Sequence, residues 1–126
     1  MDDNPASTED EQRLQELYDV WTYFDETGDE SAILPILAND VVVLPPGHDP
    51  IIGKEAATDW YARVDPSDGD WASRNREIVL GTDLAVNWMT TDGEFQGEEI
   101  QFQGMAIYEK RDDKWKLRFD IWNHSE

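Results

Sequence analysis

The chain of 126 residues has no cysteine, which excludes disulfides, thiolate nucleophiles and zinc–thiolate sites together. It also lacks any run approaching the roughly 18 apolar residues of a membrane-spanning helix. The first residues are acidic where a secretory signal would be basic and then apolar, so we expect a cytoplasmic protein. The length predicts a single domain over residues 1–126, of which residues 1–8 are expected to fray.

Positive charge is scarce as well. The chain has 29 acidic residues and 10 basic ones, which gives a net charge of −19 at pH 7. Such a surface repels nucleic acid and anionic membranes, so neither is an expected partner. The acidic residues are spread along the whole chain, which resembles proteins of salt-accumulating halophiles, where molar salt shortens the Debye length to about 3 Å. An ordinary solvated acidic face is the alternative.

The first half of the chain has the spacing of helices. Apolar residues recur at three- and four-residue steps from Leu14 to Phe24, which predicts a long amphipathic helix ending at Thr27–Gly28. A short helix is expected over residues 29–38, with a kink at Pro35, because proline cannot donate a backbone hydrogen bond. A third helix is expected over residues 53–64.

Strands are expected elsewhere. The apolar run Val41–Leu44, rich in β-branched residues, predicts a buried strand over residues 40–45. From residue 71 onward, apolar and polar residues alternate, which is typical of strands. Four more strands are expected, over residues 74–80, 84–91, 98–109 and 115–123. Helices followed by consecutive strands predict an α+β fold, in which three N-terminal helices pack on one face of a curved antiparallel sheet.

The order of these segments is similar to that of a known superfamily. Gly-Asp at residues 28–29, Asp-Val-Val-Val-Leu-Pro-Pro at 40–46 and Lys-Trp at 114–115 fall where the nuclear transport factor 2-like superfamily has them. The resemblance covers residues 11–123 and is closest to the SnoaL-like and ketosteroid-isomerase-like branch. It implies a cone-shaped fold, a deep apolar pocket between the helices and the sheet, and a homodimer formed through the outer sheet face.

The site residues of ketosteroid isomerases are not present. The position of their oxyanion-binding tyrosine is occupied by Trp21, which has no acidic hydroxyl, and the position of their catalytic base by Pro45. Residues 101–107 contain no aspartate to act as the second acid. Steroid isomerase activity is therefore not expected, despite the resemblance in fold.

Asp120, between apolar residues of the last strand, is the leading catalytic candidate. SnoaL-like cyclases use an aspartate on a late strand as general base, and the resemblance implies the same role here. An apolar pocket disfavours the charged carboxylate and raises its pKa toward the working pH, as abstraction of a proton from carbon requires. Alternatively, Asp120 accepts hydrogen bonds from Arg118 or a neighbouring strand, or faces water.

His48, in the loop at the expected pocket mouth, is the second candidate, as an acid that titrates near neutral pH. An exposed loop histidine beside Asp49 is the alternative. Aromatic and polar side chains are expected to line the pocket, although such aromatics also form ordinary cores. These residues are Tyr18, Trp21, Leu44, Trp60, Tyr61, Trp88, Gln101, Gln103, Trp122 and Asn123.

The expected site holds neither a metal nor a cofactor. Two isolated histidines give no transition-metal spacing, and the serines have no neighbouring base. Two functions remain open. One is a lyase, isomerase or cyclase that abstracts a proton next to the carbonyl group of a small molecule. The other is a non-catalytic dimeric module that binds a small apolar ligand. They differ in whether Asp120 points inward.

Overall fold

The computed structural model describes residues 8–63, 70–95 and 98–125. Residues 1–7 of the segment expected to fray lie outside the described residues, whereas Thr8 begins the first helix. The described chain has helices α1 and α2, two 3-10 turns (η1 and η2) and six strands. Their bounds are α1 Thr8–Thr27, η1 Glu30–Ala32, η2 Leu34–Ile36, β1 Leu37–Leu44, β2 Ile51–Ile52, α2 Lys54–Arg63, β3 Asp70–Leu80, β4 Leu84–Phe95, β5 Glu98–Arg111 and β6 Lys114–Ser125.

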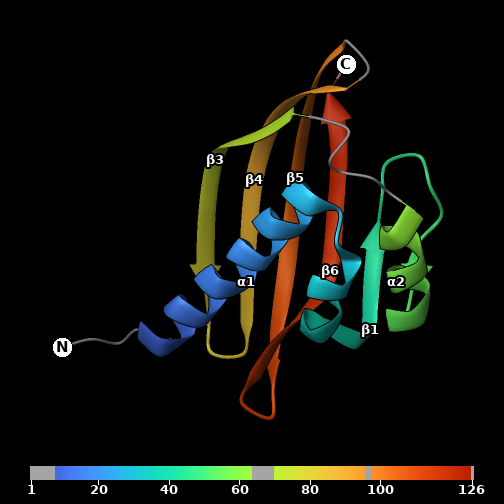
Figure 1. The fold of residues 1–126 in the computed structure, drawn as a ribbon. Helices are drawn as coiled ribbons and strands as arrows, with labels where there is room; N and C mark the ends of the chain where they lie inside the picture. The colour runs from blue at the N-terminus through green and yellow to red at the C-terminus, as the bar shows by residue number, and fades with distance from the viewer. Residues whose placement is uncertain (1–7, 64–69, 96–97, 126) are drawn as a thin grey trace.

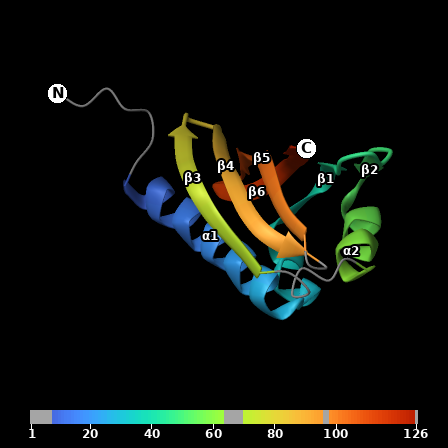
Figure 2. The same ribbon diagram turned by 90° about the horizontal axis from the view of Figure 1, so that it is seen from above.

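The strands form one mixed sheet in the order β2-β1-β6-β5-β4-β3. Strand β1 pairs with β6 in parallel, whereas every other pair is antiparallel, so the expectation of a purely antiparallel sheet was wrong. Parallel pairing is possible because α2 and four strands separate β1 from β6 along the chain. The sheet curves, α1 crosses one of its faces, and α2 packs against β1 and β2 (Figures 1 and 2).

Helix α1 has the expected face and end. Leu14, Leu17 and Phe24 are at most 3% exposed and belong to the core. Gly28 has φ 70° and donates its backbone N–H to the carbonyl of Phe24 at 2.7 Å. Glycine accepts this left-handed conformation without the steric cost of a side chain, which ends the helix as the sequence predicts.

The expected helix over residues 29–38 is instead the pair of 3-10 turns. Asp29 caps the first turn, accepting a hydrogen bond from the backbone N–H of Ser31 at 3.1 Å. Pro35 lies at the start of the second turn, where no backbone donor is required. Because two short turns use fewer residues than a helix, β1 begins at Leu37 rather than at the expected Asp40.

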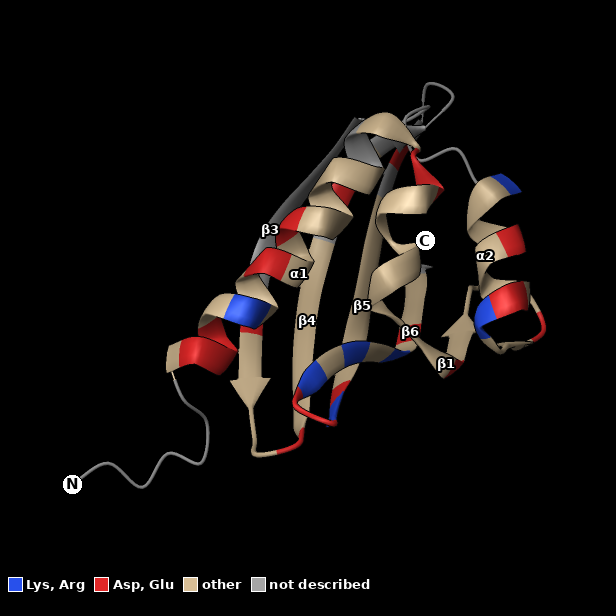
Figure 3. Cartoon of the chain, turned by 60° about the horizontal axis from the view of Figure 1, so that its bottom comes forward, with Lys and Arg blue, Asp and Glu red and all other residues tan. Residues whose placement is uncertain are grey.

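The β5–β6 hairpin turns through Asp112 and Asp113, whose φ angles of 52° and 63° match the two-residue turn that suits twisted strands. Half of the chain's basic residues lie on this hairpin, whereas acidic residues are spread over α1, α2 and the turns (Figure 3). Lys110 pairs with Asp10 of α1 at 3.2 Å, so the hairpin binds the start of the first helix. Within the described part of the chain, neither helix has the length and apolar composition needed to cross a membrane.

Candidate active site

Asp120 lies on the inner face of the sheet, beneath the helices. In the register of the sheet it is opposite Ala106 of β5 on one side and Val43 of β1 on the other. Both neighbours are buried in the core, at 9% and 0% exposure. Directly opposed residues of paired strands share a face of the sheet, so the carboxylate of Asp120 points into the interior.

A β-bulge sets this orientation. Leu117 is opposite Tyr108, whereas Phe119 is opposite Ile107, so Arg118 is an extra residue in β6. Leu117 and Tyr108 are both buried on the inner face. Because the extra residue reverses the alternation, Asp120 returns to the inner face, which a regular strand would give to Phe119.

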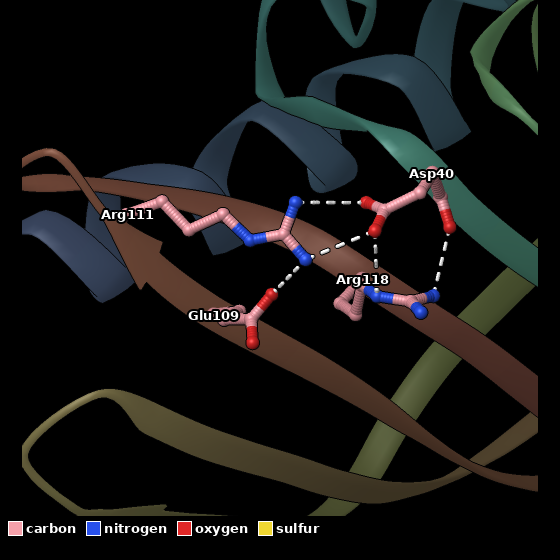
Figure 4. Close-up of polar contacts among 4 residues, drawn as sticks. All are labelled: Asp40, Glu109, Arg111 and Arg118. Carbon is pink, nitrogen blue, oxygen red and sulfur yellow. Dashed lines mark hydrogen bonds and ion pairs between the residues drawn. The ribbon is translucent and has the colours of Figure 1, made fainter.

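An ion-pair cluster around Asp40 holds the bulge (Figure 4). Arg118 donates to the backbone carbonyl of Asp40 at 2.7 Å and pairs with its carboxylate at 3.4 Å. Arg111 donates to both carboxylate oxygens of Asp40, at 3.1 and 3.0 Å, and also pairs with Glu109. The hydrogen bond from Arg111 is the main cause of the lowered pKa of Asp40. Arg118 therefore anchors β6 to β1 and is not the partner of Asp120.

The partner of Asp120 is Tyr61 of α2. The hydroxyl of Tyr61 donates to Oδ2 of Asp120 at 2.5 Å, and the tyrosine side chain is only 3% exposed. Burial raises the pKa of Asp120 to about 6, while the hydrogen bond from Tyr61 acts in the opposite direction. A carboxylate with this pKa is largely ionised at neutral pH and is a stronger base than an ordinary aspartate.

Aromatic rings surround this hydrogen bond. Trp21 of α1 and Trp60 of α2 both contact the ring of Tyr61, with centroid distances of 5.4 and 5.3 Å. Trp60 also contacts Trp122 of β6 at 5.5 Å, two residues beyond Asp120. Four of the aromatic residues expected to line a pocket therefore meet beside the candidate base. Their rings provide an apolar setting that favours neutral, flat molecules.

Asn87 of β4 was not expected in the site. It is 3% exposed and faces inward opposite Ala106, so one small residue separates it from Asp120 in the row across the sheet. Among the described residues, none donates a hydrogen bond to its buried Oδ1, and none accepts one from the buried Nε1 of Trp21. One signal was available in the sequence. Asn87 lies two positions after Ala85 in the stretch Leu84–Trp88, and side chains two positions apart in a strand lie on the same face of the sheet.

Comparison with known proteins agrees with this fold. The family model for the SnoaL-like domain matches residues 14–118. The chain belongs to the SnoaL-like domain family. No curated protein matches it.

Solved structures with this fold have low sequence identity to the SnoaL-like chain. A nuclear transport factor 2-like protein of unknown function from Pseudomonas putida superposes with a TM-score of 0.82 at 16% identity, over 93% of this chain and 87% of the other. A ketosteroid isomerase-like protein from Erwinia carotovora atroseptica gives 0.78 at 17%, over 95% and 99%. A proposed dehydratase from Streptomyces avermitilis gives 0.78 at 12%, over 95% and 99%. These likenesses establish the fold alone.

Five of the residues expected to line the pocket lie on the outer face of this SnoaL-like sheet. Trp88 is opposite the exposed Met105 and donates to Glu77 at 2.8 Å, on the face opposite to that of Asn87. Side chains alternate along a strand, and the position of the bulge could not be inferred from the sequence, so their expected placement was wrong. The five are Leu44, Trp88, Gln101, Gln103 and Asn123.

The remaining candidates lie apart from Asp120 or at the margin of the site. Tyr18 is partly exposed on α1, one turn before Trp21. His48 is exposed, and its Nδ1 lies 2.7 Å from the carbonyl oxygen of Asp49, so the structure does not bring it to Asp120. No group of three metal-ligating side chains is found among the described residues.

A shallow depression of about 500 Å³ opens at the start of α2, away from Asp120 and Tyr61. It mixes basic, acidic and apolar groups, so it lacks the apolar character expected of the family pocket. Its lining consists of Asn39, Ile52, Gly53, Lys54, Glu55, Ala56 and Asp59.

Proposed function

We propose that this SnoaL-like protein is a small-molecule lyase, isomerase or cyclase in which Asp120 abstracts a proton from a carbon next to a carbonyl group. The observation that carries the proposal is the inward carboxylate of Asp120, hydrogen-bonded to the buried Tyr61, whose ring contacts Trp21 and Trp60. Its pKa of about 6 suits a base that works near neutral pH. A ketosteroid isomerase-like protein and a proposed dehydratase share the fold, and both names belong to this class of chemistry.

The reaction begins with ionised Asp120 and the ligand's carbonyl group held among the aromatic side chains. As the carboxylate takes the proton, the electron pair of the C–H bond moves toward the carbonyl oxygen, where negative charge develops. Protonation of Asp120 weakens its hold on the Tyr61 hydroxyl, which then donates to that oxygen. The indole N–H of Trp21 has no partner within residues 8–63, 70–95 and 98–125 and provides a second donor. Exposed His48 has no part in this scheme.

The ligand would lie between the sheet and the two helices, in the apolar pocket that the family resemblance implies. On the inner face of β5, Ala106 is next to Asp120 and Gly104 is opposite Trp122. The side chains of this central strand therefore project little from the sheet toward the ligand. The aromatic cluster would form the opposite wall. In this arrangement the substrate is a flat, largely apolar carbonyl compound.

The test is exchange of the α-protons of 1-indanone with D2O, followed by NMR. We expect the wild-type protein to accelerate exchange, with a rate that rises with pH through about 6 as Asp120 ionises. Asp120→Asn should reduce the rate at least about 100-fold. Asp49→Asn, in the exposed loop, is the matched control. Equal exchange by wild type and Asp120→Asn would show that this carboxylate is not the base.

The second candidate function is a non-catalytic dimeric module. The exposed apolar side chains of Val79, Leu84 and Met105, on β3, β4 and β5, favour a homodimer through the sheet face opposite to Asp120. In that case the Tyr61–Asp120 pair would only shape the ligand site. Asp120→Asn would then bind 1-indanone as tightly as wild type, and neither protein would exchange its protons.

A further inference from the structure

Asn87 is a buried polar side chain with its acceptor unused. The residue is 3% exposed, and its Oδ1 receives no hydrogen bond from the part of the chain that the structure describes. Such a group has lost its water without gaining a partner, which destabilises the fold, and native structures contain few of them. An unused donor, Nε1 of Trp21, is buried in the aromatic cluster beside Tyr61. A ligand that supplies one donor and one acceptor would satisfy both groups.

The sheet directs Asn87 toward the same interior as Asp120. The two residues flank Ala106 in one row, so their Cα atoms are about 10 Å apart, which is twice the spacing of paired strands. In the adjoining row, Gly104 lies between Met89 and Trp122. A Cβ added at Gly104 would be 2.6 Å from the carbonyl oxygen of Ile121 and 2.8 Å from Cβ of Trp122. Strand β6 and Trp122 therefore leave no room for a side chain at Gly104, and between Asn87 and Asp120 the sheet carries only the small side chain of Ala106.

The charges indicate which ligand fits. Four of the five basic residues of the β5–β6 hairpin are engaged away from this row, and the fifth, Lys114, is exposed beside the hairpin turn. Arg111 and Arg118 bind Asp40, and Lys110 binds Asp10. Lys116 donates to the carbonyl of Pro35. None of these cations is offered to an anion beside Asp120, and the chain carries a net charge of −19. The site therefore suits a neutral molecule better than a carboxylate or a phosphate.

We infer that Asn87 is a positioning residue, selecting a neutral carbonyl compound that also carries a hydroxyl or N–H group at the end remote from the acidic carbon. Oδ1 of Asn87 accepts a hydrogen bond from that group, and the Trp21 indole donates to a ligand oxygen. This inference rests on the proposed function in one respect, that a ligand binds in the interior beside Asp120. To the proposed function it adds the polar group of the ligand that Asn87 recognises.

The first test is the stability of the ligand-free protein. Asn87→Leu replaces an amide whose buried Oδ1 has no partner among the described residues by an apolar side chain of similar size, so we expect the melting temperature to rise by about 2–5 °C. Asn123→Leu makes the same change on the exposed outer face and should shift it by less than about 1 °C. A lower melting temperature for Asn87→Leu would show that the fold itself uses the amide, and would overturn the inference.

The second test compares 5-hydroxy-1-indanone with 1-indanone, followed by tryptophan fluorescence. Wild type and Asn123→Leu should bind the hydroxylated ketone about tenfold more tightly, as one added hydrogen bond allows. Asn87→Leu should lose this preference and still bind 1-indanone within about twofold of wild type. Equal binding of the two ketones by wild type, or no binding of either, would overturn the inference.

The two proposals fail separately. Asp120→Asn should abolish proton exchange and retain the preference for the hydroxylated ketone. If that preference depends on Asn87 but no exchange occurs, the catalytic proposal fails and the role of Asn87 stands. If exchange depends on Asp120 and Asn87→Leu keeps the preference, the role of Asn87 fails alone.

Discussion

Leu117 and Asp120 lie on the same face of β6 although they are three positions apart, because Arg118 between them is an extra residue in the β5–β6 pairing. In a regular strand, residues three apart point to opposite faces. The candidate base therefore reaches the interior only because the strand is irregular, and the ion pairs around Asp40 hold that irregularity.

Asp40→Ala should weaken the attachment of β6 to β1. The cluster is half exposed, so we expect a loss of only about 1 kcal/mol in the free energy of unfolding at pH 7, measured with urea. The pKa of Asp40 is lowered in the folded state, so its contribution is present above pH 4 and is lost as pH falls further. Asp49→Ala, in an exposed loop, is the control. A loss equal to that of the control would mean that the cluster does not hold the bulge.

Asp120→Asn should stabilise the protein increasingly as pH rises. The pKa of Asp120 is raised from 3.8 to about 6, so the folded state holds the proton more tightly than the unfolded state between these values. Folding stability from this group is greatest at low pH and declines up to about pH 6. The advantage of Asn over Asp should therefore grow by about 1.5 kcal/mol from pH 5 to pH 7.5 in urea unfolding. A constant difference would contradict a buried, perturbed carboxylate.

Tyr61→Phe should raise the pKa of Asp120 above 6. The tyrosine hydroxyl stabilises the ionised carboxylate and is the factor that opposes burial. The measurement is a titration of the side-chain carboxyl carbon of Asp120 by NMR, with Tyr23→Phe on the exposed side of α1 as control. An unchanged or lower pKa in Tyr61→Phe would mean that the hydrogen bond is not maintained in solution.

Met105→Lys should shift the proposed homodimer toward monomers. Met105 is 48% exposed on the outer face, opposite Trp88. A charge there would have to be desolvated in an apolar interface. We therefore expect the dissociation constant of the dimer, measured by sedimentation, to increase at least about tenfold. Thr82→Lys, in the β3–β4 turn, should have no effect on association. A wild-type protein that stays monomeric at millimolar concentration would rule out this interface.

Removing salt should loosen the fold if the acidic composition reflects adaptation to molar salt. With a net charge of −19, self-repulsion grows as the screening length rises from about 3 Å at 1 M to about 10 Å at 0.1 M. We expect the unfolding temperature to fall below about 0.5 M KCl. An equimolar comparison with NaCl controls for a specific ion effect. The same unfolding temperature from molar to millimolar salt would falsify the halophile interpretation.

The sequence predicts the helices and the hairpin strands because their signals are local. The apolar stripe of α1, the glycine at its end and the alternation after residue 71 depend on neighbours within a few positions. Pro35 was recognised as an obstacle, but its conversion of the expected helix into two 3-10 turns depends on the surrounding packing. Strand β2 was missed because it pairs through only two residues.

The face on which each candidate site residue lies could not be predicted. Asp120 faces inward because of the bulge at Arg118, and Arg118 contacts Asp40, which is far away in the sequence. Trp88 and Asn123 were placed in the pocket from residue type alone, and their register puts them outside. Asn87 was missed because it is notable only as a buried side chain whose Oδ1 has no partner among the described residues. A local sequence pattern does not reveal this property.

The parallel pairing of β1 with β6 also governs when the site can form during synthesis. Val43 and its strand partner Asp120 are about 77 residues apart, so β1 and the helices beside it have their main sheet neighbour only after the ribosome has released β6. The hairpins of β3, β4 and β5 have local partners and can assemble earlier. The Tyr61–Asp120 pair is thus completed last, and its formation marks the joining of the two halves of the chain.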